Sequence, residues 1–61
     1  MLNYFKKILE KVSFDRNLFE KELKKAIKSL VAEEVEELRK WCYEAFGARY
    51  PLVLSECFVQ A

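Results

Sequence analysis

The chain has 61 residues, about half of them apolar and a third charged, with a net charge of +1 and no histidine. This composition is typical of a small globular domain and excludes a disordered chain, which has fewer aromatic residues and more glycine and proline. Without histidine there is no Ser–His or Cys–His catalytic pair and no imidazole metal ligand, so we expect no enzyme activity, metal or cofactor.

The first predicted helix covers residues 3–12 and is amphipathic. Its apolar side chains share one helical face, and they are Leu2, Phe5, Ile8, Leu9 and Val12. A helix this short is marginal alone in water, so we expect it to pack on the core of the domain. Docking on a membrane surface or on a partner is the alternative.

The second predicted helix covers residues 16–29. Asp15 is expected to cap it, because a carboxylate can accept hydrogen bonds from the free N–H groups of the first turn. Phe14 and Phe19 flank this cap at the spacing of a hydrophobic staple. The buried stripe of the helix is predicted to be Phe19, Leu23, Ala26, Ile27 and Leu30.

A change in the sign of the charge marks the end of this helix. Lysines at i, i+3, i+4 and i+7 are followed by glutamates, namely Lys21, Lys24, Lys25 and Lys28, then Glu33, Glu34, Glu36 and Glu37. Lysines favour the C-terminal end of a helix and glutamates the N-terminal end, so we predict a turn at residues 30–32. Because neither glycine nor proline lies there, one continuous helix is the alternative.

The third predicted helix covers residues 32–46, with Trp41 at the edge of its apolar face. That face is predicted to be Val35, Leu38, Cys42, Ala45 and Phe46. Gly47 is expected to end the helix in the left-handed conformation.

Pro51 suits the first position of a fourth, short helix over residues 51–59. Its apolar lining is predicted to be Leu52, Val53, Leu54, Cys57 and Phe58. An extended segment over residues 50–54 is the alternative, because this stretch contains β-branched and aromatic residues.

Together these elements predict an all-α protein, a small antiparallel bundle of three helices with a short fourth helix, in a single domain over residues 1–61. No stretch reaches the ~18–20 apolar residues that cross a bilayer, and charges interrupt any signal peptide, so we expect the cytoplasm. There Cys42 and Cys57 would be reduced and packed in the core, with a regulatory thiol as the alternative.

The charge is distributed unevenly, since residues 1–30 carry +4 and residues 31–61 carry −3. Either the two halves neutralise each other within the molecule, or the basic half binds a polyanion. Four ammonium groups on one helix face can neutralise several phosphates, which makes nucleic-acid binding the alternative function. This candidate polyanion-binding face consists of Lys21, Lys24, Lys25 and Lys28.

Aromatic and basic residues gather around the end of the third helix, and they are Arg39, Trp41, Tyr43, Arg49 and Tyr50. These residue types anchor protein interfaces, although Trp41 and Tyr50 could instead cover the ends of a small core. We therefore predict a non-catalytic protein–protein interaction module. Its partner is expected to be another protein or a second copy of the chain, and no small-molecule substrate is evident.

Overall fold

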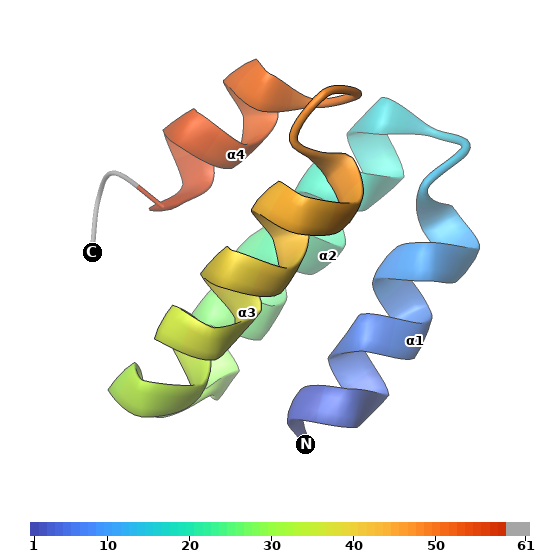
Figure 1. Ribbon diagram of the computed structural model, residues 1–61. Coiled ribbons are helices and arrows are strands. Elements are labelled where there is room, and N and C mark those ends of the chain that lie inside the picture. Colours follow the sequence, from blue (N-terminus) through green and yellow to red (C-terminus); the bar gives the residue numbers. More distant parts are fainter. Residues whose placement is uncertain (59–61) are drawn as a thin grey trace.

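The computed structural model describes residues 1–58, and this part of the chain contains helices and no strand. The four helices are α1 (Leu2–Val12), α2 (Arg16–Ser29), α3 (Ala32–Phe46) and α4 (Pro51–Phe58), shown in Figure 1. The first three agree with the predicted ranges to within one residue. The fourth confirms a helix rather than an extended segment, and the predicted end at Val59 lies outside the described residues.

The predicted cap of α2 is confirmed, but the predicted staple is wrong. The Asp15 carboxylate accepts hydrogen bonds from the backbone N–H groups of Asn17 and Leu18, at 2.9 and 3.2 Å. Phe19 is buried, whereas the Phe14 side chain is 73% exposed and does not cover it. The start of α2 is therefore stabilised by the carboxylate and not by an apolar contact across the cap.

The predicted turn between α2 and α3 is also confirmed. Leu30 and Val31 both have extended backbone angles, which separate the two helices. The Glu34 carboxylate accepts a hydrogen bond from the Val31 N–H at 3.4 Å. This is one half of a capping box, because valine has no side-chain oxygen to complete the other half. One glutamate of the charge reversal thus contributes directly to the start of α3.

Gly47 ends α3, but the predicted left-handed conformation is wrong. Its φ and ψ are −59° and −36°, which is right-handed. Its N–H donates to the Tyr43 carbonyl at 3.1 Å, and a β-carbon at this position would lie 2.2 Å from the same oxygen. Glycine is needed here because the backbone approaches closely, and not because φ is positive.

A single apolar core joins all four helices. Its buried members are Phe5, Leu9, Phe19, Leu23, Ala26, Leu30, Leu38, Cys42, Phe46, Val53, Leu54, Cys57 and Phe58. The predicted apolar faces are wrong at two positions, Ala45 and Leu52, which are both exposed. Successive helical residues are ~100° apart, so α4 cannot point Leu52, Val53 and Leu54 to the same side. Leu52 therefore faces away from the core.

The connections between helices lie at two different ends of the molecule, which measures 26 × 22 × 18 Å. The Tyr50 hydroxyl donates a hydrogen bond to the Ser13 carbonyl, which joins the α3–α4 loop to the α1–α2 turn. In Figure 1 the α2–α3 turn lies at the far end from this junction. No helix within residues 1–58 combines the length and apolar character needed to cross a membrane.

Candidate protein interface

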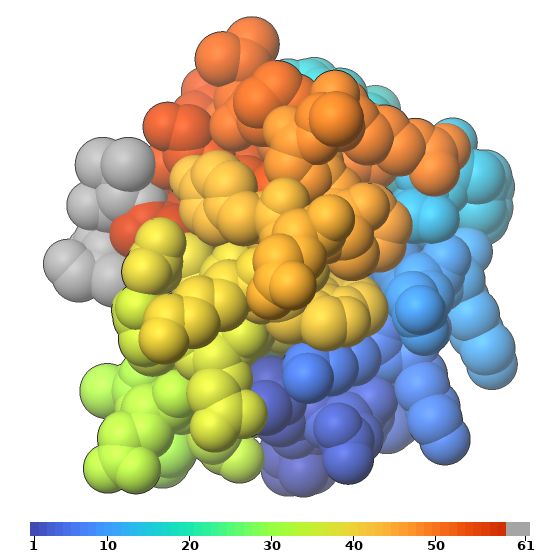
Figure 2. Space-filling model, viewed as in Figure 1, coloured from blue at the N-terminus to red at the C-terminus, as the bar shows by residue number. Residues whose placement is uncertain are grey.

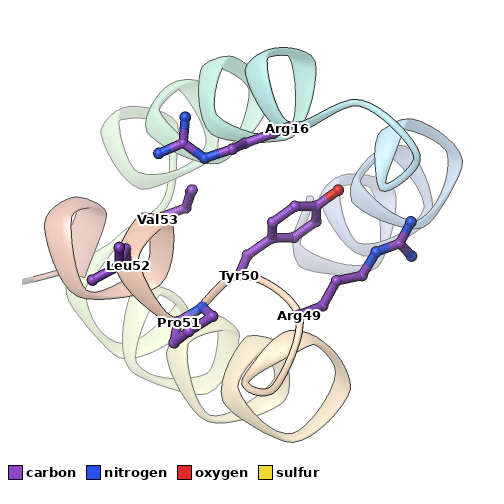
Figure 3. Close-up of a pocket in the computed structure, with 6 residues that line it drawn as sticks. All are labelled: Arg16, Arg49, Tyr50, Pro51, Leu52 and Val53. Atoms are coloured by element: carbon purple, nitrogen blue, oxygen red, sulfur yellow. The ribbon is translucent and has the colours of Figure 1, made fainter.

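An open hollow of about 210 Å³ lies where α2 and α4 begin. It is lined by Arg16, Arg49, Tyr50, Pro51, Leu52 and Val53 (Figure 3). Arg16 is the first residue of α2 and Pro51 the first residue of α4, so two helix starts border it. Pockets for small molecules usually measure ~300–1,000 Å³. The hollow therefore fits one side chain of a partner better than a whole substrate.

Arg16 and Arg49 both line the hollow, and neither forms an ion pair within residues 1–58. In Figure 3 the Arg16 guanidinium, from the start of α2, lies near Val53, whereas the Arg49 guanidinium, from the α3–α4 loop, lies on the other side of the Tyr50 ring. The ion pairs found in the described chain involve Lys24 and Arg39 instead. The Arg49 Cζ atom lies 5.4 Å from the centre of the Tyr50 ring, a cation–π arrangement that orients the guanidinium. The charges of Arg16 and Arg49 are therefore not neutralised by an ion pair within the described chain.

Tyr50 is a fixed wall of this hollow. Its ring stacks on Phe19, with centroids 4.9 Å apart and planes 28° apart, while its hydroxyl donates to the Ser13 carbonyl. A ring held by Phe19 and by the Arg49 guanidinium is not free to stack on a nucleobase. Tyr50 therefore serves to position Arg49 and the start of α4.

Exposed apolar side chains occur at the same end of the molecule as the hollow. Leu52 is 72% exposed on the outer face of α4 and lines the hollow. Phe14 lies in the α1–α2 turn, next to the Ser13 carbonyl that Tyr50 binds. Exposed apolar residues next to arginine are characteristic of protein interfaces. We call this surface the basic–apolar end, and it consists of Phe14, Arg16, Arg49, Tyr50 and Leu52.

The group of residues predicted as an interface is divided between several surfaces. Arg49 and Tyr50 lie at the hollow. Trp41 lies toward α1, where its ring meets Phe46 edge to face, with centroids 5.5 Å apart. The Lys6 ammonium lies 5.7 Å from the centre of the Trp41 ring. The half-buried Trp41 therefore covers the junction of α1 with α3.

Arg39 and Tyr43 lie on other parts of α3. The Arg39 guanidinium is hydrogen-bonded to the Glu36 carboxylate, which lowers the pKa of Glu36 and raises the pKa of Arg39. The Tyr43 ring lies 6.4 Å from the ring of Phe58, beside α4. Neither residue reaches the hollow, so the predicted group contributes only Arg49 and Tyr50 to the basic–apolar end.

The sequence patterns do not identify the other members of this surface. They place Leu52 in the core and Phe14 in a staple, and they give Arg16 no role. The run of three apolar residues at 52–54 contains a signal, because a helix must turn one of them away from a single core. Arg16 has no comparable signal, since only the packing of α4 against α2 brings it to the hollow.

The candidate polyanion-binding face lies on the outer side of α2, where its four lysines are all exposed. The Lys24 ammonium lies 3.3 Å from the Glu20 carboxylate. The other three, Lys21, Lys25 and Lys28, form no ion pair within the described part of the chain. This surface can meet phosphates through ammonium groups alone, which gives affinity without sequence readout.

The two cysteines are buried and free. Burial, with a smaller contribution from the neighbouring Cys57, raises the pKa of the Cys42 thiol to about 12. Burial also raises the pKa of Cys57. Since the thiolate is the reactive form, both thiols are inert near neutral pH. Residues 1–58 contain no group of three or more acidic or cysteine side chains placed to hold a metal ion.

The residues of the basic–apolar end can form both polar and apolar contacts with a partner. Guanidinium groups form paired hydrogen bonds with carboxylates, and the exposed apolar side chains gain free energy when a partner covers them. The residues lining the hollow include no carboxylate, thiol or serine hydroxyl to act on a substrate. Comparisons of the chain with protein-family models, curated proteins and solved structures gave no match, so its function must be inferred from its own residues.

Proposed function

We propose that this chain is a small, non-catalytic protein–protein interaction module of the cytoplasm that binds its partner through the basic–apolar end. The proposal depends on one observation: Arg16 and Arg49, both without an acidic partner in the described chain, border one hollow with the exposed Leu52. Arginine beside exposed apolar side chains is the composition found where partners dock. The size of the hollow favours a single inserted side chain.

The antiparallel arrangement of α1, α2 and α3 is part of this proposal. It is supported by the Tyr50–Ser13 hydrogen bond, because antiparallel packing brings the α1–α2 turn and the α3–α4 loop to the same end. The cytoplasm is supported by the buried, unbonded state of Cys42 and Cys57, since disulfides are rare in that compartment.

Photocrosslinking at Leu52 tests the proposed surface. We replace Leu52 with p-benzoylphenylalanine, irradiate the protein in its host cells and identify the adduct by mass spectrometry. We expect one dominant protein adduct that disappears in the Arg16→Gln/Arg49→Gln background. The matched control places the photoreactive residue at the exposed Asn3. Equal labelling from both positions, or labelling that the arginine changes leave intact, would contradict the proposal.

The lysine face supports a second candidate function, nucleic-acid association. The observation in its favour is that Lys21, Lys25 and Lys28 are exposed and form no ion pair within residues 1–58. Three phosphate contacts predict a fall in affinity of about 40-fold between 50 and 200 mM salt. Gel-shift titrations with duplex DNA and with RNA measure this fall in affinity. The control is the Lys7→Gln/Lys11→Gln variant, which removes two lysines outside the lysine face. An absence of any shift at low salt would eliminate this function.

A further inference from the structure

We propose that the partner of the basic–apolar end is a second copy of this chain, which presents the start of its helix α3. The inference rests on the proposed function, because it uses the same surface and names what binds there. The contact joins opposite ends of two molecules. It follows from the charges and the exposed apolar side chains at the two ends.

The start of α3 carries acidic groups that the chain itself leaves unused. Glu34 is engaged with the backbone N–H of Val31, and Glu36 is held in an ion pair within α3. Glu33 and Glu37 are exposed and form no ion pair within residues 1–58. They are four residues apart, so they share one face of the helix. Val31 is 62% exposed beside them. We call Val31, Glu33 and Glu37 the acidic start of α3.

The two surfaces are complementary in chemistry. Arg16 and Arg49 supply two guanidinium groups, which pair with carboxylates through parallel hydrogen bonds. The acidic start of α3 supplies two carboxylates and the exposed Val31 side chain. The hollow beside Leu52 has a mostly apolar lining and has room for a side chain the size of valine. Neither surface finds this complement within the described part of its own chain.

One molecule cannot join its own two surfaces, because they lie at opposite ends. Helix α2 begins at the hollow with Arg16 and ends at Ser29, two residues before Val31. Its 14 residues span about 21 Å. In Figures 1 and 2 the yellow-green start of α3 lies at the lower edge and the orange α3–α4 loop at the upper edge. A contact between unlike ends leaves one free surface at each end of the pair, so copies add until a ring closes.

The contact is expected to be weak. The molecule measures 26 × 22 × 18 Å, so one end presents roughly 400–500 Å² to a partner. Complexes that bury less than ~1,200 Å² in total belong to the weak and transient class. We therefore expect self-association at concentrations of order 100 µM, with a strong dependence on salt.

Sedimentation velocity between about 10 µM and 1 mM tests the inference with the full chain. We expect the sedimentation coefficient of the unmodified protein to rise with concentration and to return to the monomer value in 0.5 M salt. The Arg16→Gln/Arg49→Gln and Glu33→Gln/Glu37→Gln variants should each remain monomeric. Circular dichroism checks that both variants fold. The Lys21→Gln/Lys25→Gln variant removes the same amount of positive charge elsewhere and should associate like the unmodified protein.

Mixing the two neutralised variants gives the decisive result. One variant keeps its arginines and the other keeps its glutamates, so together they can form a single contact. We expect a 1:1 dimer and nothing larger, whereas a dimer made by two identical surfaces would not reappear on mixing. A monomer at all concentrations, or association that the arginine changes leave intact, would overturn the inference.

The outcome separates this inference from the proposed function. If the protein stays monomeric while the Leu52 crosslink captures another protein through the arginines, the inference fails and the proposed function stands. If neither self-association nor such a crosslink occurs, both fail. Binding of duplex DNA or of phosphatidylserine vesicles that requires Arg16 and Arg49, without self-association, would also overturn the inference.

Discussion

Tyr50 and Ser13 are 37 residues apart in the sequence and are joined by a hydrogen bond from the Tyr50 hydroxyl to the Ser13 carbonyl. The backbone N–H of Tyr50 donates to the Phe46 carbonyl at 2.8 Å, which fixes the loop that follows α3. Because the Arg49 guanidinium lies over the Tyr50 ring, the same bond helps to place Arg49 at the hollow. One side chain therefore connects the folding of the loop to the geometry of the basic–apolar end.

The Tyr50→Phe variant removes this hydrogen bond and keeps the aromatic ring. We expect the free energy of unfolding to fall by about 1 kcal/mol, the usual net contribution of one intramolecular hydrogen bond. Urea denaturation followed by circular dichroism measures it. The control is Tyr43→Phe, whose ring is exposed on α3 and whose hydroxyl has no hydrogen bond within residues 1–58; its effect should stay within ~0.5 kcal/mol. Equal losses in the two variants would show that the Ser13 contact contributes nothing.

The helices were predictable because their signals are local. Asp15 caps α2 through backbone groups two and three residues away, and Glu34 supports the start of α3 from three residues away. The lysine-to-glutamate reversal marks a turn because charges interact with the nearest helix end. None of these interactions needs information from another part of the chain, so their outcome can be read from spacing.

The candidate interface was not predictable as a unit, because packing between distant segments creates it. Arg16 and Arg49 are 33 positions apart and line one hollow only when α4 packs near the start of α2. Trp41 has the residue type of an interface anchor, but it covers the α1–α3 junction. Residue type thus indicates which side chains suit an interface. It does not indicate which of these side chains are instead packed against the core.

Substitutions at Gly47 test why glycine is required there. The requirement could come from a left-handed backbone conformation or from a right-handed conformation in which a β-carbon has no room. A β-carbon would lie 2.2 Å from the Tyr43 carbonyl oxygen, so any side chain must displace the backbone. We expect Gly47→Ala and Gly47→Asn both to lower the free energy of unfolding, by about 1–3 kcal/mol. A left-handed residue would instead tolerate asparagine much better than alanine. Chemical denaturation of the two variants distinguishes these cases, and a nearly neutral Gly47→Asn would contradict the crowding.

Stability should fall in alkaline solution because the thiols are buried. In the unfolded chain Cys42 ionises near pH 9.0, whereas in the folded protein its pKa is about 12. Above pH 9 the unfolded state therefore binds fewer protons than the folded state, and stability decreases as the pH rises toward 12. Cys42 alone should cost about 1.4 kcal/mol at pH 10, and Cys57 adds to this loss.

The matched protein for this experiment is the Cys42→Ala/Cys57→Ala variant. Tyrosines and lysines titrate in both proteins, so the difference between the two pH profiles isolates the thiols. Urea denaturation at pH 8 and pH 10 supplies the four free energies needed. Reaction of the native protein with a disulfide reagent at pH 8 should be slow for the same reason. Identical pH profiles, or fast labelling of both thiols, would show that the cysteines are exposed.

Leu52 and Leu54 form a matched pair on one helix, because the same residue type occurs with opposite burial. Leu54 is completely buried, whereas Leu52 is mostly exposed at the basic–apolar end. Leu54→Ala should lower the free energy of unfolding by about 2–5 kcal/mol, through lost burial and the cavity that remains. A core this small supplies only ~3–5 kcal/mol in total, so that variant should be largely unfolded.

The milder Leu54→Val variant keeps the comparison measurable, with an expected loss of about 1 kcal/mol in urea denaturation. Leu52→Ala should change stability by less than ~0.5 kcal/mol and yet weaken the sedimentation-detected association, since Leu52 contacts the partner and not the core. A destabilisation by Leu52→Ala equal to that of Leu54→Val would mean that α4 buries its other face. In that case the hollow would lose its exposed apolar side chain, and the two arginines with Phe14 would form a weaker surface for a partner.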